Sequence, residues 1–261
     1  MRLFHAIKHI ACSNILILST CVALAHVLMK AGVHPGAAEM IFEGADAGQP
    51  EDPPKPPGKI HFSRGIPMTK IDDVLLAYEM NNEPIPVSHG APLRAVVGGW
   101  YGMASVEWLT RIVVSDRPFR GYFRALDYAY WEEQAGMPFR VPIAEIKVEA
   151  QISWPALHEV VPVKSRYRVV GTAWAGDSEV SKVEVSTDAG KSFSQATLLG
   201  GHIRHVRRFW EYEWGDPGSP GFCTLMARAA DSQGRQQRAE RDRKIGDYVI
   251  NHTLPVEVEL K

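Results

Sequence analysis

The sequence predicts an α+β protein in two parts, a mixed N-terminal part and an all-β C-terminal part. Apolar residues recur at helical spacing over 22–33, which favours an amphipathic helix in the first part. After Pro142 the pattern changes to short runs in which apolar and polar residues alternate, as expected of half-buried strands. Six such runs occupy 146–152, 167–174, 180–186, 208–214, 223–229 and 256–260. Together they favour a β-sandwich.

The composition excludes several classes of protein. With 261 residues and 45% hydrophobic residues, the chain can form one large or two ordinary domains with a packed core. The formal net charge of −1 shows no basic excess, so neither nucleic acid nor an acidic membrane surface is expected as the main partner. The cysteines, Cys12, Cys21 and Cys223, are too scattered for a disulfide framework or a zinc site. Cys223 lies in an apolar run and is expected in the core.

Two interpretations fit the N-terminus. Residues 1–25 carry Arg2 and Lys8, then an apolar run with Ala23 and Ala25 at the spacing of a signal-peptide cleavage site. Cleavage after Ala25 would cut the predicted helix over 22–33. We therefore expect an atypical N-terminus over 1–21 without a stable membrane span. The compartment, cytoplasmic or periplasmic, stays open.

A glycine-rich stretch over 89–109 predicts an anion site. It places an imidazole, a guanidinium and a hydroxyl, those of His89, Arg94 and Ser105, among small Gly and Ala residues that let backbone N–H groups approach an anion closely. Arg94 would offer a planar fork to a phosphate, and Ser105 would cap a following helix. The alternative is a buried turn with a satisfied histidine.

Shorter features surround this stretch. The run over 40–48 predicts a strand that ends in Asp46, and the proline-rich segment over 50–58 predicts an extended, exposed loop. Asp46 before Ala-Gly is typical of a turn residue. Asp72 and Asp73 are expected to open a helix, because carboxylates stabilise a helix N-terminus.

The order of four motifs resembles the sulfite oxidase family of molybdopterin enzymes. They are L-L-A-Y-E-M-N (75–81), H-G-x-P-L-R (89–94), G-W-Y-G (99–102) and S-V-x-W-L (105–109). The resemblance runs from about Val22 to the C-terminus and implies a partial molybdopterin-binding domain over 22–141.

The C-terminal part, 142–261, also resembles this family. The runs G-T-A-W-A-G, V-E-V-S-T-D-A-G-K-S-F and A-R-A-A-D-S-Q-G resemble its immunoglobulin-like dimerisation domain. A homodimer formed through 142–261 is therefore implied.

The resemblance also implies residue roles. His89 and Arg94 would grip the phosphate of the molybdenum–molybdopterin cofactor, Ser105 and Val106 would offer hydroxyl and backbone donors, and Asp46 would accept pterin N–H groups. No residue is assigned as a metal ligand.

Substrate contacts are implied as well, in an enzyme that transfers an oxygen atom to a small oxyanion such as sulfite. Asp127-Tyr128 matches a family pair whose tyrosine faces substrate, so Tyr128 is the candidate catalytic residue in an aromatic-rich run over 119–131 that is otherwise expected to pack. Arg207 or Arg208 would reach substrate, or form a solvated face.

His34-Pro35-Gly36 is similar to the haem-ligand turn of cytochrome b5 domains fused to some sulfite oxidases. The neighbouring sequence has no room for the helices and second axial ligand that a haem module needs. No haem is expected, and these residues predict the turn that ends the helix over 22–33.

The chain also departs from the family pattern. Glu107 stands where lysine is usual and Gly98 where proline is usual; the carboxylate near a phosphate would lower affinity unless it turns away. Cys12 only faintly imitates the context of the metal-ligating cysteine, and the early His and Arg motif is absent. We therefore expect an N-terminally truncated cofactor domain, inactive towards sulfite alone. The alternatives are a non-catalytic, dimerising or partner-binding immunoglobulin-like protein, or a secreted one exported by residues 1–25.

Overall fold

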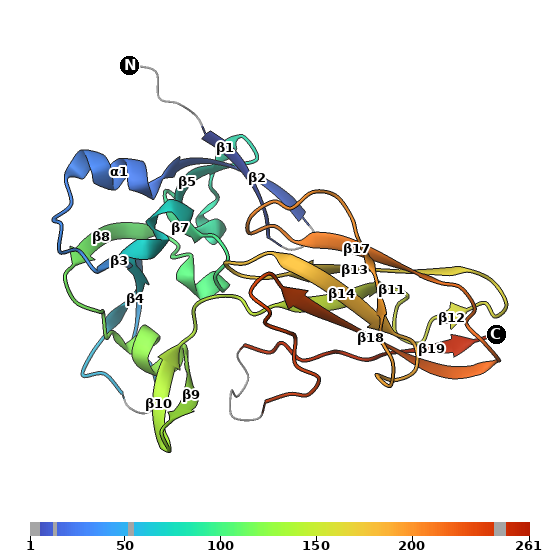
Figure 1. The fold of residues 1–261 in the computed structure, drawn as a ribbon. Coiled ribbons are helices and arrows are strands. Elements are labelled where there is room, and N and C mark those ends of the chain that lie inside the picture. Colours follow the sequence, from blue (N-terminus) through green and yellow to red (C-terminus); the bar gives the residue numbers. More distant parts are fainter. Residues whose placement is uncertain (1–5, 13–14, 52–54, 243–248) are drawn as a thin grey trace. The chain divides into compact units, whose positions relative to one another are not determined.

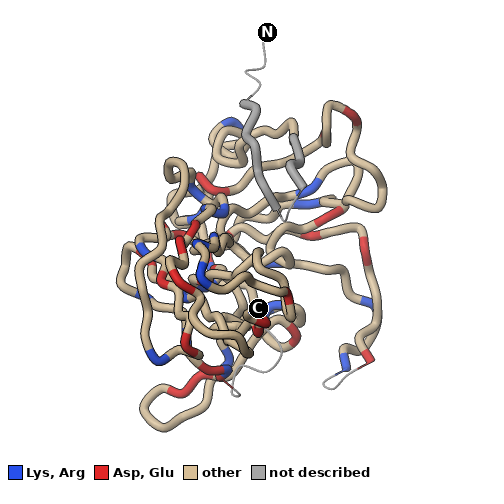
Figure 2. The backbone as a smooth tube through the Cα atoms, turned by 90° about the vertical axis from the view of Figure 1, so that its right-hand side faces the viewer, with Lys and Arg blue, Asp and Glu red and all other residues tan. Residues whose placement is uncertain are grey.

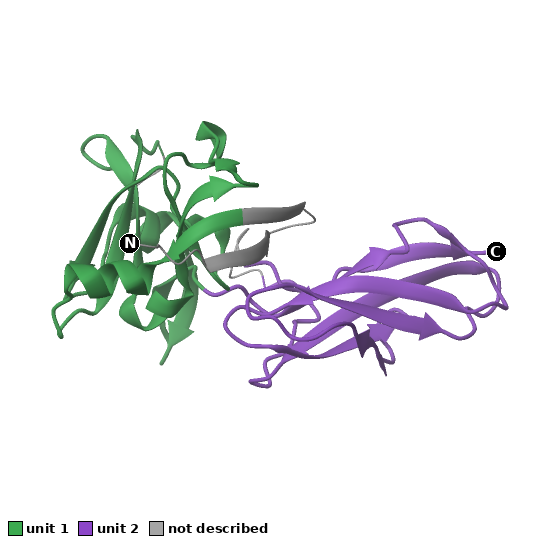
Figure 3. Cartoon of the chain, turned by 90° about the horizontal axis from the view of Figure 1, so that it is seen from above, with its two compact units in different colours: residues 1–144 green, residues 145–261 purple. Residues whose placement is uncertain are grey.

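The computed structural model describes residues 6–12, 15–51, 55–242 and 249–261 (Figure 1). They divide into two compact units, Met1–Ala144 and Glu145–Lys261 (Figure 3). The division falls three residues beyond the predicted boundary at 141. The described part is mostly β-sheet with few helices.

The described residues of unit 1 form three antiparallel sheets. In the five-stranded sheet the order is β1-β2-β5-β6, and β7 pairs with β5 beside β6. The three-stranded sheet has the order β4-β3-β8, and β9 and β10 form a separate hairpin. The strands are β1 (Ala6–Cys12), β2 (Ile15–Ala23), β3 (Glu39–Gly48), β4 (Ile60–Pro67), β5 (Val74–Met80), β6 (Glu83–Pro84), β7 (Arg94–Val97), β8 (Leu109–Ser115), β9 (Ala129–Gln134) and β10 (Met137–Pro142).

Helices connect these strands and contribute to one apolar core. Leu24 and Leu28 of α1 pack with Phe42 of β3, Val74 of β5 and Val97 of β7, so both larger sheets share this core. The helices are α1 (Leu24–Ala31), the 3₁₀ helices η1 (Met68–Asp73), η2 (Val87–His89) and η3 (Gly102–Ala104), and the π-helix η4 (Phe123–Asp127). Among the described residues, no helix has the length and apolarity needed to cross a membrane.

The structure corrects the N-terminal predictions. The strand β2 extends to Ala23, and its residues 19–23 pair with β5, so residues before Val22 belong to the sheet of unit 1. The helix α1 is shorter than predicted and ends where Gly32, at φ 76°, donates its N–H to Leu28 O. The predicted turn follows at residues 35–36.

Two predicted helices are wrong. Asp72 and Asp73 close η1 and lead into β5, and Ser105 closes η3 and is followed by β8. An Asp or Ser before an apolar run signals a helix start only when the run has helical spacing. β8 instead contains Thr110, Ile112 and neighbouring valines, and β-branched side chains favour a pleated strand.

Unit 2 is a β-sandwich. Its four-stranded sheet has the order β11-β13-β17-β16, and its five-stranded sheet has the order β12-β19-β18-β14-β15. The strands are β11 (Glu149–Trp154), β12 (Val160–Val161), β13 (Tyr167–Trp174), β14 (Val180–Ser186), β15 (Ser194–Gln195), β16 (Thr197–Leu198), β17 (Arg208–Trp214), β18 (Gly221–Asp231) and β19 (Val256–Leu260). All six predicted strands are confirmed, although β11 begins three residues late and β18 is longer.

The core of the sandwich contains side chains of both sheets. Trp210 of β17 is fully buried, as are Leu225 of β18 and Val258 of β19. Gly171 of β13 makes room for the Trp210 indole, since a Cβ there would collide with the ring. Cys223 packs against this core, as predicted, and its Sγ donates to Thr187 O at 2.9 Å.

Positively and negatively charged residues are mixed along the chain, without large blocks of one sign. Figure 2 shows Lys and Arg interspersed with Asp and Glu in the described residues. This pattern agrees with the formal net charge of −1.

Glu149 of β11 makes the stability of unit 2 depend on pH. Its side chain is buried, and burial raises the pKa of the carboxyl to about 7, although a hydrogen bond from Gln151 and the charge of Arg207 lower it. The folded protein then binds a proton at Glu149 more tightly than the unfolded chain does. Stability should therefore fall as pH rises from 4.5 to about 7.

Glu149→Gln should remove this dependence. We expect the variant to be more stable than the wild type by about 1–3 kcal/mol at pH 8 and nearly equal to it at pH 4, because the penalty applies only to the charged form. Urea unfolding of the full chain at both pH values measures the difference. Glu213→Gln, at an exposed position of β17, is the control. A difference that does not change with pH would contradict this account.

Candidate functional site

Three segments of unit 1 that the sequence analysis singled out meet in the structure. They are residues 44–46 in β3, residues 89–94 from the end of η2 to the start of β7, and residues 105–108 before β8. Ala45 N–H donates to Trp108 O at 2.9 Å, and Trp108 N–H donates to Gly90 O at 3.3 Å. We call these segments the loop cradle. It contains Asp46, His89, Arg94, Ser105 and Val106.

The β3 segment of the loop cradle is a bulge. The register of β3 with β4 shifts between Glu43 and Ala47, which leaves Asp46 exposed at the bend. Gly44 permits the bend, because a Cβ there would collide with the Asp46 carboxylate and lie 2.9 Å from Glu107 O. His61 Nδ1 of β4 lies 3.1 Å from Gly44 O. No sequence signal had identified His61.

The second segment turns at a glycine. Gly90 follows η2 in the left-handed region, at φ 94°. A Cβ on Gly90 would lie 2.8 Å from Glu107 Cβ, so the third segment packs directly on its backbone. Trp108 Nε1 donates to Val87 O at 2.9 Å, which fastens the third segment to η2.

Arg94 and Glu107 form an ion pair within the loop cradle. Arg94 Nη1 lies 2.9 Å from Glu107 Oε1 and also donates to His89 O at 2.9 Å. The Arg94 side chain is 20% exposed and that of Glu107 is 31% exposed. Arg94 Nε is buried and has no hydrogen-bond partner among the described residues. The Glu107 carboxylate therefore points toward Arg94, the residue predicted to bind the phosphate.

Ser105 and Val106 fasten β7 to the loop cradle. Ser105 Oγ accepts the Val97 N–H at 3.0 Å, and Val106 O accepts the Ala95 N–H at 2.8 Å. Val106 is almost fully buried.

Tyr128 packs elsewhere in unit 1. Its ring meets Phe62 edge-on, with 6.1 Å between centroids, and the Phe123 ring lies 5.0 Å from Phe62. The expected packing of this aromatic run is confirmed for Phe123, whereas Trp131 is half exposed. Tyr128, which was expected to face substrate, also packs on Phe62, and its catalytic role stays a prediction. Because Phe62 follows His61 in β4, this strand connects Tyr128 with the loop cradle.

A buried ionic cluster near Tyr128 was missed by the sequence analysis. Glu39 of β3 pairs with Arg124 of η4 at 2.9 Å and accepts the Phe119 N–H. Arg64 of β4 is 1% exposed and donates to Ile143 O. Burial and the charge of Arg124 lower the pKa of Arg64 to about 10, against the opposing effect of Glu39. The sequence did hold a signal for this cluster, since Arg64 lies inside the strand pattern F-S-R-G-I-P, where a buried charge needs a partner.

In unit 2, both arginines considered for substrate have partners. The Arg207 guanidinium lies over the Trp174 ring at 4.7 Å. Arg208 Nη2 donates to Gly200 O at 3.2 Å. Both therefore support the sandwich, and their assignment to substrate remains a prediction.

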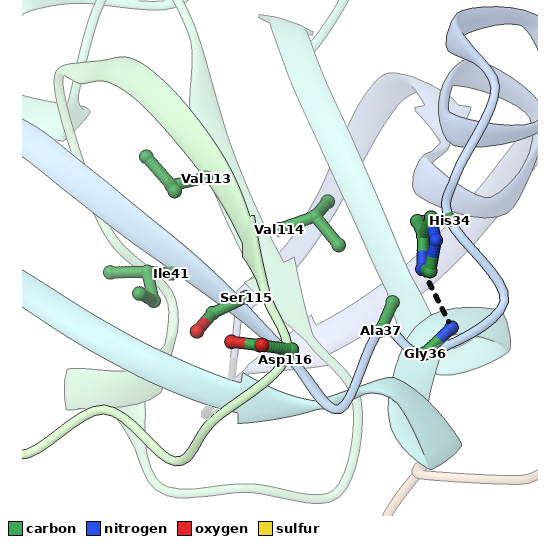
Figure 4. A pocket seen from close by; sticks show the side chains of 8 residues that line it. All are labelled: His34, Gly36, Ala37, Ile41, Val113, Val114, Ser115 and Asp116. Atoms are coloured by element: carbon green, nitrogen blue, oxygen red, sulfur yellow. Dashed lines mark hydrogen bonds between the residues drawn. The ribbon is translucent and has the colours of Figure 1, made fainter.

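A pocket of about 420 Å³ lies beside the edge of β8 in unit 1. Figure 4 shows His34 at one side, where its Nδ1 accepts the Gly36 N–H at 3.1 Å, and Asp116 at the end of β8. None of the predicted site residues lines this pocket. It is therefore separate from the loop cradle.

Comparison with known proteins identifies both units. Residues 18–123 match the oxidoreductase molybdopterin binding domain, and residues 140–215 match the Mo-co oxidoreductase dimerisation domain. The chain is 33% identical to mitochondrial sulfite oxidase of Drosophila melanogaster over 90% of its own length and 40% of that protein. It is 30% identical to the NADPH nitrate reductase of Fusarium oxysporum over 69% of its own length and 21% of that protein.

A solved structure shows the same fold. The sulfane dehydrogenase SoxCD from Paracoccus pantotrophus superposes with a TM-score of 0.74 at 26% identity, covering 92% of this chain and 59% of that one. The matches define a molybdopterin oxidoreductase domain joined to a dimerisation domain. The chain belongs to the sulfite oxidase family of molybdopterin oxidoreductases. It spans 40% of the length of the Drosophila and chicken sulfite oxidases.

Gly90→Ala tests the packing of the loop cradle. Alanine would have to adopt the left-handed backbone conformation of Gly90, and its Cβ would collide with Glu107 Cβ. We therefore expect the free energy of unfolding to fall by about 1–3 kcal/mol. Gly102→Ala is the matched control, because its Cβ would meet open space. Urea denaturation of both variants measures the effect. Equal stability of the two variants would contradict the packing described.

Proposed function

We propose that unit 1 holds the phosphate end of a molybdenum–molybdopterin cofactor in the loop cradle, in an enzyme that transfers an oxygen atom to a small oxyanion such as sulfite. The observation that carries the proposal is the buried Nε of Arg94, which has no hydrogen-bond partner in the described structure. Membership of the sulfite oxidase family supports the same assignment.

The loop cradle suits a phosphate only partly in charge. Gly44 and Gly90 let its segments pack closely on one another, and Arg94 Nε has an N–H that lacks an acceptor. Glu107 opposes the fit, since its carboxylate already holds Arg94 Nη1. Arg94 would therefore bind phosphate in competition with Glu107, and His89 would line the opening from η2.

Other residues would act on the rest of the cofactor and on substrate. Asp46, exposed at the bulge, would accept N–H groups of the pterin ring. Ser105 and Val106 would offer hydroxyl and backbone donors to the cofactor, and their hydrogen bonds with β7 would keep Arg94 in place. Tyr128 would face the substrate from a position set by Phe62. When bound, the molybdenum centre supplies the two-electron oxygen transfer.

Unit 2 would serve self-association. We propose that the sandwich is immunoglobulin-like and pairs with a second copy, as the matched dimerisation domain suggests. A non-catalytic dimerising protein is the second candidate function, and the observation that favours it is the Arg94–Glu107 ion pair, which weakens the loop cradle as an anion site. Cofactor content distinguishes the two candidates.

Arg94→Lys tests the cofactor assignment. We expect the pterin that copurifies from a cofactor-producing host to fall about tenfold, because lysine lacks the planar guanidinium fork and a hydrogen bond to a charged group contributes about 1.5–3 kcal/mol. Pterin is measured by fluorescence after oxidative release, and molybdenum by mass spectrometry. Arg111→Lys, an exposed position paired with Glu43, is the control. Unchanged pterin in Arg94→Lys would refute the role of Arg94, and wild-type protein without pterin or molybdenum would favour the non-catalytic candidate.

The full chain should form dimers. Sedimentation velocity at micromolar concentration should show a species of twice the mass of the 29.0 kDa chain. A monomer at every concentration up to the solubility limit would contradict the proposed role of unit 2.

A further inference from the structure

Glu107 has the position and charge of an anion bound by Arg94. Its Oε1 lies 2.9 Å from Arg94 Nη1, within the range of charge-assisted hydrogen bonds. Arg94 Nε remains without a partner in the described structure. The carboxylate therefore holds Nη1 and leaves the buried Nε without an acceptor.

The backbone holds this carboxylate in place. Glu107 Cβ packs on Gly90, and the next residue, Trp108, is fastened to Gly90 O through its backbone N–H and to Val87 O through its indole. Trp108 O accepts the Ala45 N–H from the β3 bulge. The ion pair thus differs from a pair of long surface side chains, which must lose rotamer freedom to meet.

A phosphate at Arg94 would meet Glu107 directly. A phosphate that takes Nη1, alone or together with Nη2, would bring its oxygens next to the carboxylate, and like charges at such separations repel. The Arg94 and Glu107 side chains are 20% and 31% exposed, so solvent screens this repulsion only in part. The two anions therefore compete for the same guanidinium.

Taking the proposed phosphate site as its basis, we propose that Glu107 is an internal anion that closes the loop cradle, and that phosphate binds Arg94 only after displacing this carboxylate. Glu107 thus weakens the binding of anionic ligands to the loop cradle. Its displacement would open the site without any change in the strands that carry it.

Neutral variants of Glu107 test the proposal with inorganic phosphate as the probe. The dissociation constant is measured by ³¹P NMR titration at low ionic strength for the wild type, Glu107→Gln and Glu107→Ala. We expect both variants to bind phosphate about tenfold or more tightly than the wild type, because the competing charge is gone. Glu107→Ala keeps the Cβ that packs on Gly90 and serves if the glutamine variant does not fold.

Two controls separate this effect from a general change of charge. Glu43→Gln removes a carboxylate that pairs with Arg111 at 2.8 Å on the neighbouring strands, and it should bind phosphate as weakly as the wild type. Adding Arg94→Lys to Glu107→Gln should abolish the gain. Both results together would support the proposal.

The outcomes also separate this proposal from the proposed function. If the wild type and Glu107→Gln bound phosphate equally, and both lost it with Arg94→Lys, the phosphate site would stand and the role of Glu107 would be overturned. If Glu107→Gln and Glu107→Ala folded but bound no phosphate through Arg94, the phosphate site and the role of Glu107 would both fall.

Discussion

The close approach of residues 107–108 to two glycine backbones is the constraint on which the candidate site depends. Gly44 and Gly90 come from segments far apart in sequence, and a side chain on either would separate them from Glu107. The hydrogen bonds of Trp108 with Ala45 and Gly90 form only because this approach is possible. The arrangement of charge around Arg94 therefore follows from packing of the backbone rather than from the charged side chains themselves.

Sequence patterns predicted the strands of unit 2 well, because one face of each strand lies on a shared core and burial imposes alternation. They failed at Asp73 and Ser105, where a capping residue precedes an apolar run. The same residue types end 3₁₀ turns, and only the β-branched content of the following run shows that a strand begins.

The segments that form the candidate site were predicted, but their side-chain contacts were not. The segments of Asp46, His89 and Arg94 meet through residues 107–108, and their roles toward a cofactor stay a prediction. The pairing of Arg94 with Glu107 depends on the turn at Gly90, and the burial of Arg64 depends on contacts with residues distant in sequence. Neither can be inferred from local spacing, because periodicity reports which face of a strand is buried and not which side chain lies opposite.

The fluorescence of Trp108 depends on the structure of the loop cradle. Its indole donates to Val87 O, its backbone adopts φ 45°, and it is directly joined to Glu107. A displacement of the Glu107 carboxylate that shifts this backbone would alter the hydrogen bond of the indole and the polarity around the ring. The emission of Trp108, one of the seven tryptophans of the chain, would then change with the state of the ion pair.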